Sequence, residues 1–109
     1  MAYDEKLAER IRTRLKSTKG LTEKKMFGGV GFLVNGNMAC GVNKQDLIVR
    51  LNDEDFEHSL KQRHVRIFDM TGRPMKGWIL VSEQGTATDK ALQTWIEKGV
   101  AFARSLPNK

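Results

Sequence analysis

The dipeptide Asn35-Gly36 constrains the fold of this chain more than any other feature. It separates two runs of apolar and small residues, 29–34 and 37–42. A type I′ turn requires positive φ at both central residues, and Asn-Gly meets this requirement at the lowest steric cost. The sequence therefore predicts a tight antiparallel hairpin at this place.

The turn also sets which residues face each other across the hairpin. The predicted pairs are Val34 with Asn37, Leu33 with Met38, Phe32 with Ala39 and Gly31 with Cys40. Because side chains alternate along a strand, one face should carry Val30, Phe32, Val34 and Ala39, and the other Leu33, Met38, Cys40 and Val42. A solvated antiparallel sheet normally has one polar face. Both faces here are apolar, so we expect the sheet to need a cover on each side.

Further helices and strands surround this hairpin. Apolar periodicity predicts helices at 4–17 and 53–62, and a last helix capped by Thr88 and ended by Pro107. Gly99 lies on the apolar stripe of that last helix, where it would allow close approach to the sheet. Strands are predicted at 46–51, 65–68 and 77–81, with an optional short strand at 24–27. The predicted fold is an α+β two-layer sandwich, an antiparallel sheet of about five strands with helices at both termini and one between strands.

Length and composition favour one domain. A chain of 109 residues can build a single core, so residues 1–109 are predicted to form one domain. No apolar run is long enough to span a membrane, and the N-terminus lacks the apolar segment of a signal peptide. The single cysteine, Cys40, suits a reducing compartment. We therefore expect a cytoplasmic protein.

The sequence shows no catalytic or metal-binding constellation. His58 and His64 stand apart from Cys40 and match no metal-site spacing. The glycines at 28–31 lead into a strand, whereas phosphate-binding loops lead into a helix. We therefore expect no enzyme activity, no cofactor and no metal. The net charge of +6 and the basic first helix leave open a weak contact with nucleic acid, although a solvated helix face is the simpler interpretation.

The predicted loop at 69–76, with the residues beside it, is the main candidate binding site. Arginine and lysine can anchor an acidic partner, and methionine and tryptophan are common at contact surfaces. The candidate binding residues are Asp69, Met70, Arg73, Met75, Lys76 and Trp78. The alternative is a rigid loop in which Asp69 and Arg73 pair only to hold its shape.

Several motifs carry a resemblance to a known family. They are Met26-Phe-Gly-Gly, Asn35-Gly36, the stretch Asp69-x-Thr-Gly-Arg-Pro-Met-Lys-Gly-Trp78, and Trp95 with Phe102-Ala-Arg-Ser-Leu-Pro107. With these motifs the sequence resembles the TfoX N-terminal-domain family, related to the TfoX/Sxy regulators of natural competence, over nearly its whole length. The resemblance implies a secretion-chaperone-like α+β fold, no known catalytic activity and a role beside other transcription proteins. The full regulators carry a further helical domain, so the resemblance is to a single-domain member.

Two classes of function follow from these observations. The first is a non-enzymatic interaction or regulatory domain, linked to transcription or competence, that forms a homodimer through its second apolar sheet face and binds a protein partner. The candidate interface residues are Phe32, Val34 and Met38. The second is a small-molecule or peptide binder, or a minor enzyme, whose groove is lined by these residues and Trp78, with Arg73 and Lys76 as anion anchors.

Overall fold

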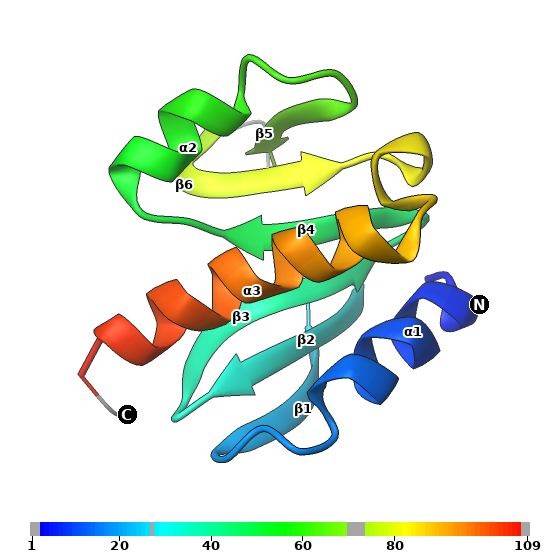
Figure 1. Cartoon of the computed structure of the whole chain (residues 1–109), viewed down its shortest axis with the longest axis vertical. Coiled ribbons are helices and arrows are strands. Elements are labelled where there is room, and N and C mark those ends of the chain that lie inside the picture. Colours follow the sequence, from blue (N-terminus) through cyan, green and yellow to red (C-terminus); the bar gives the residue numbers. More distant parts are fainter. Residues whose placement is uncertain (1–2, 27, 70–73, 108–109) are drawn as a thin grey trace.

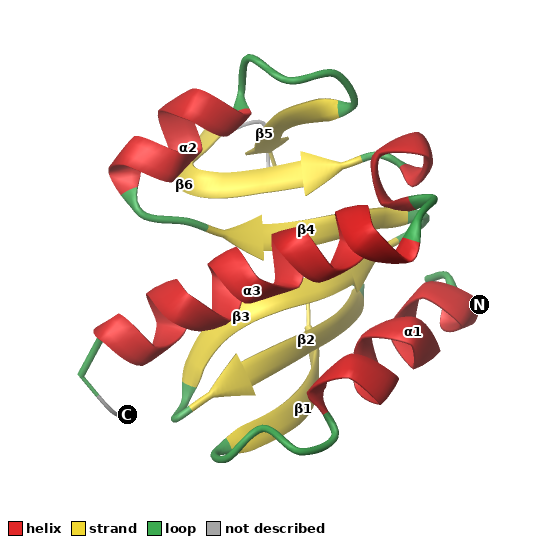
Figure 2. Ribbon diagram, in the orientation of Figure 1, coloured by secondary structure: helices red, strands yellow, loops and turns green. Residues whose placement is uncertain are grey.

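One antiparallel sheet carries all the helices on a single face (Figures 1 and 2). The computed structural model describes residues 3–26, 28–69 and 74–107. The strands within these residues are β1 (Leu21–Met26), β2 (Gly29–Val34), β3 (Asn37–Asn43), β4 (Asp46–Arg50), β5 (Val65–Asp69) and β6 (Pro74–Val81). The helices are α1 (Glu5–Leu15), α2 (Asp53–Ser59), α3 (Asp89–Ser105) and the short 3₁₀ helix η1 (Glu83–Thr86). The strand order β1-β2-β3-β4-β6-β5 confirms the predicted α+β class.

The sheet has one strand more than the sequence predicted. The piece expected as an optional strand at 24–27 is the full strand β1, which pairs with β2 along its length. Each α-helix begins directly after a residue that caps it. The side-chain oxygen of this N-cap residue accepts a hydrogen bond from a backbone N–H that has no partner within the helix. Thr88 accepts a hydrogen bond from the Ala91 N–H, at 3.1 Å, as predicted. Asp4 and Asn52 cap α1 and α2 in the same way.

The predicted turn at Asn35-Gly36 is confirmed. Asn35 has φ of 55° and Gly36 has φ of 84°, the left-handed values that a type I′ turn requires. The first two pairs beyond the turn, Val34 with Asn37 and Leu33 with Met38, are also as predicted. The local turn chemistry therefore determined the start of the register.

A β-bulge changes the register beyond these two pairs. Phe32 pairs with Cys40 and Gly31 pairs with Gly41, so the predicted pairs Phe32 with Ala39 and Gly31 with Cys40 are wrong. Ala39 is the extra residue on β3. A bulge leaves one residue unpaired and turns the following side chains to the opposite face.

Because of the bulge, the two sheet faces carry other residues than the sequence predicted. Cys40 and Val42 lie with Val30 and Phe32 in the core beneath the helices, not opposite them. Phe32 and Val34 both have side chains that are 0% exposed. They belong to the covered face, so these two predicted interface residues do not lie on a surface that a partner could reach in this conformation.

The sheet face that carries no helix is also dry. Its central residues form a cluster, called here the rear cluster: Met38, Ile48, Phe68 and Leu80, each between 1% and 7% exposed. Met75 and Trp78 pack against this cluster. A Cβ added at Gly41 would lie 2.8 Å from the Met38 Cε, so the methionine lies across the space that this glycine leaves. The premise that this face needs an outside cover is therefore wrong for the rear cluster, because long side chains of the chain itself bury it.

Candidate functional site

An arginine and a tryptophan face each other where β4 ends. Arg50 is the last residue of β4 and pairs with Trp78 of β6. The next residue, Leu51, donates its backbone N–H to the Gly77 carbonyl oxygen at 2.7 Å. β6 runs beyond this point to Pro74, so the β5–β6 hairpin projects past the end of β4.

The guanidinium of Arg50 lies close to two aromatic rings. Its Cζ is 5.3 Å from the centre of the Trp78 ring and 5.4 Å from the centre of the Phe102 ring, which belongs to α3. We call these three residues the Arg50 stack. Each ring attracts the cation through its negative π-face, with about 0.5–1 kcal/mol per contact at exposed sites. All three side chains are half-buried.

Arg50 differs in its partners from the arginines of α1. Arg10 and Arg14 reach Asp89 at 3.4 and 3.1 Å, and Arg12 pairs with Glu9 and Glu23. The Arg50 side chain, in contrast, makes no ion pair and no hydrogen bond to any residue that the structure describes. The α1 pairs neutralise much of the basic flank that the sequence offered for nucleic-acid contact.

The predicted binding residues do not all lie at one place. Trp78 belongs to the Arg50 stack, and Met75 packs beside it against the rear cluster. Lys76 is exposed, two residues before Trp78 on β6. Asp69 is exposed at the end of β5 and lines a separate groove on the rear side. Met70 and Arg73, and hence the predicted pairing of Arg73 with Asp69, lie outside the described residues.

Two members of the Arg50 stack were missed at the sequence level. In the sequence, Phe102 stands out only as part of a family motif, and in the structure it is half-buried near the end of α3. Arg50 lies within the predicted strand at 46–51 and is not among the predicted binding residues. Its position opposite Trp78 could have identified Arg50. This position depends on the pairing of β4 with β6, which is not the next strand in the chain.

The rear groove, of about 620 Å³, contains one ion pair. Its lining residues are Asn43, Lys44, Asp46, Arg66, Ile67, Phe68, Asp69 and Leu80. Across it, the Arg66 Nη2 lies 2.6 Å from the Asp46 Oδ2. Phe32, Val34 and Met38, predicted to line a groove with Trp78, are not among these residues, and Phe32 and Val34 are 0% exposed.

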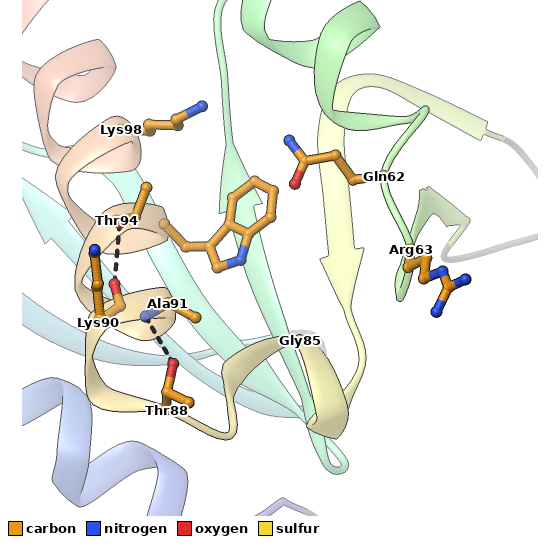
Figure 3. A pocket seen from close by; sticks show the side chains of 9 residues that line it. Gln62, Arg63, Gly85, Thr88, Lys90, Ala91, Thr94 and Lys98 are labelled. Carbon is orange, nitrogen blue, oxygen red and sulfur yellow. Dashed lines mark hydrogen bonds between the residues drawn. The ribbon is translucent and has the colours of Figure 1, made fainter.

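A second hollow, of about 400 Å³, lies on the helix side between α3, η1 and the segment after α2 (Figure 3). The Lys98 Nζ is 5.7 Å from the centre of the Trp95 ring. In Figure 3, Gln62 and Lys98 approach each other across the hollow, whereas Lys90 and Arg63 point away from it. The cations that line it therefore do not converge on one point.

The described residues offer little for catalysis. Burial raises the pKa of the Cys40 thiol to about 12, which keeps it protonated and unreactive. No group of three His, Cys, Asp or Glu side chains that could hold a metal occurs within residues 3–26, 28–69 and 74–107. Over the same residues, no helix combines the length and apolar character needed to cross a membrane.

Together, the sheet and its surface define a two-layer α+β domain that displays an arginine in contact with two aromatic rings. The chain belongs to the TfoX N-terminal domain family, whose sequence model matches residues 13–103. No curated protein and no solved structure matches the chain.

Proposed function

We propose that this domain is a non-enzymatic regulatory module that binds another protein through the surface around the Arg50 stack. Its family is associated with competence regulation, which agrees with a regulatory role. By extension from the family, the partner belongs to the transcription apparatus and the site of action is the cytoplasm.

The observation that carries this proposal is the half-buried Arg50 stack with an apolar neighbour. Tryptophan and arginine are the residues most enriched among binding hot spots, and methionine adapts to irregular partner surfaces. Met75 and Trp78 are both half-buried beside the rear cluster. The exposed Lys76 adds a positive charge to the same strand. Rings, a methionine and cations thus lie near the end of β4 and along the first residues of β6.

A charge reversal tests the proposed surface. The wild-type chain and the Lys76→Glu variant are used to capture cross-linked partners from cells that express the protein, and mass spectrometry identifies them. Lys90→Glu is the matched control, because Lys90 is also exposed but belongs to α3, away from this surface. We expect that the wild type and the control capture some partners that the Lys76→Glu variant does not capture. An identical set of partners for all three proteins would contradict the proposal.

We also propose a homodimer, on a narrower basis than the sequence offered. The rear cluster is already buried, so among the described residues its half-buried rim, Met75 and Trp78, is what a second copy could cover. Isologous packing of such a rim is the commonest way in which a small domain assembles. The alternative of a small-molecule site loses its predicted groove, because Phe32 and Val34 lie on the covered face.

A further inference from the structure

We propose that Arg50 is the receptor for a carboxylate of the partner protein, carried by a segment in which an Asp or Glu stands beside large apolar residues. This inference rests on the proposed function, since it names the chemistry of the partner for the same surface. The occupant is an acidic protein segment, not a nucleic acid and not a free small anion.

The guanidinium of Arg50 is restrained by its contacts with two rings. The rings of Trp78 and Phe102 lie near Arg50, with their centres at 5.3 and 5.4 Å from its Cζ. Contacts with these rings restrict the side chain and do not use its N–H groups as donors to an oxygen acceptor. A carboxylate binds the N–H edge of a guanidinium with two parallel hydrogen bonds. Because the side chain is already held, less conformational entropy is lost on binding.

A further feature of Arg50 is the missing acceptor among the described residues. A guanidinium has five N–H donors, and none of those on Arg50 is used by an acceptor within the described parts of the chain. The acids nearest in sequence, Asp53, Glu54 and Asp55, open α2 and form no ion pair with it. The site therefore holds a cation, restrained by two rings, whose N–H donors can bind an anion from outside these residues.

The residues around Arg50 favour a protein segment over nucleic acid as its partner. The surface next to the Arg50 stack is the apolar rim Met75 and Trp78, which suits aliphatic and aromatic side chains of a protein. Nucleic acid would instead need a row of cations along its phosphates. The acids Asp53, Glu54 and Asp55 follow Arg50 directly and would repel such a polyanion. A single carboxylate within an apolar segment meets less of this repulsion.

Panning of a random dodecapeptide library displayed on phage against the immobilised full chain tests the inference. We expect enriched peptides to share an Asp or Glu next to Leu, Phe or Trp. Synthetic copies of these peptides should bind Arg50→Gln about tenfold or more weakly than wild type, because a charge-assisted bidentate contact is lost. Arg50→Lys keeps the charge without the planar fork and should lie between the two. Arg63→Gln is the charge-matched control, since Arg63 is exposed and lies after α2, and it should bind like wild type.

Four outcomes would overturn the inference. One is enrichment of peptides without acids, and another is binding that ignores both changes at Arg50 while thermal unfolding shows that the variants fold. The third is failure to enrich any peptide. If partner capture through Lys76 succeeds in that case, the proposed function stands and only the acidic segment is rejected. A mixed-sequence single-stranded oligonucleotide that binds more tightly than the peptides, in a manner dependent on Arg50, would also overturn it in favour of nucleic acid.

Discussion

At the scale of single residues, the closest contact between helix and sheet depends on the absence of one side chain. A Cβ added at Gly99 of α3 would lie 2.3 Å from the carbonyl oxygen of Ala39, the bulged residue of β3. Real Cβ atoms do not approach a backbone oxygen so closely. The glycine costs roughly 1 kcal/mol in helix propensity, and the packing of α3 against β3 offsets that cost.

Gly99→Ala should therefore destabilise the domain. The added methyl group forces α3 away from β3, and overpacking of this kind typically costs about 1–3 kcal/mol, which exceeds the gain in helix propensity. Urea unfolding followed by circular dichroism measures the change. Ala101→Gly, at an exposed position of the same helix, is the control and should cost only about 1 kcal/mol. Unchanged or higher stability of Gly99→Ala would contradict the close approach.

The second prediction at this scale concerns Cys40. The thiol is completely buried and its pKa is raised to about 12 by the loss of hydration. It should react with Ellman's reagent near pH 8 only as fast as the chain unfolds, because the thiolate is the reactive form. Addition of urea above the unfolding midpoint should release rapid reaction of the one thiol in the chain. Rapid reaction of the native protein would show that Cys40 is accessible.

At the scale of elements, an ion pair joins α1 to the edge strand β1. The Arg12 Nε and Nη2 each lie 2.7 Å from an oxygen of Glu23, so the pair is bidentate. The guanidinium holds the pKa of Glu23 below its ordinary value of 4.5, while partial burial acts in the opposite direction. The Glu23 side chain is 37% exposed, so screening by water limits the stabilisation to about 1 kcal/mol or less.

Glu23→Gln should lower the free energy of unfolding by about 1 kcal/mol or less near neutral pH. A carboxyl group with a lowered folded pKa contributes stability above its unfolded pKa, and loses it as the pH falls through the folded pKa. The difference between wild type and variant should therefore close below about pH 4, as urea titrations at several pH values can show. Glu57→Gln, at an exposed position of α2, is the control and should give a smaller difference. A difference that persists unchanged in acid would contradict the ion pair.

Element boundaries show what local signals can predict. The turn at Asn35-Gly36 and the cap at Thr88 were predicted because each depends on residues a few positions apart. The bulge at Ala39 was not, since no nearby residue requires it. Its carbonyl lies against Gly99, sixty positions further along the chain. The register beyond the first two pairs was therefore set by packing between distant segments.

At the scale of the whole molecule, the rear cluster decides how the domain can assemble. Its residues are dry within a single chain, so association cannot gain much by covering them. What is left for contact is the rim, Met75 and Trp78. A homodimer built on this rim should have a modest interface, below the roughly 800 Å² per partner of a standard stable complex.

The predicted assembly is therefore a dimer that dissociates on dilution. Sedimentation velocity over a range of concentrations should show a species of twice 12.4 kDa that gives way to the monomer. Met75→Glu should shift this equilibrium toward the monomer, because it places a charge on the rim. Lys90→Glu, on α3, should leave it unchanged. A monomer of 12.4 kDa at every concentration would reject the dimer and leave the binding of another protein untouched.

Only part of the candidate site could be predicted from the sequence. Trp78, Met75 and Lys76 stand together on one strand, so composition was enough to single them out. Arg50 and Phe102 come from β4 and α3, and only the pairing of β4 with β6 brings them to Trp78. Phe32 and Val34 were misplaced because a register argument cannot show which sheet face the helices will cover.

By itself the sequence determined the elements, the tight turn and the α+β class, because these depend on side-chain periodicity and on the φ preferences of neighbouring residues. Only the tertiary structure decided the bulge, the assignment of faces and the contacts of Arg50 with two rings. These depend on where α3 and β6 come to lie, and that position minimises the free energy of the whole packed domain.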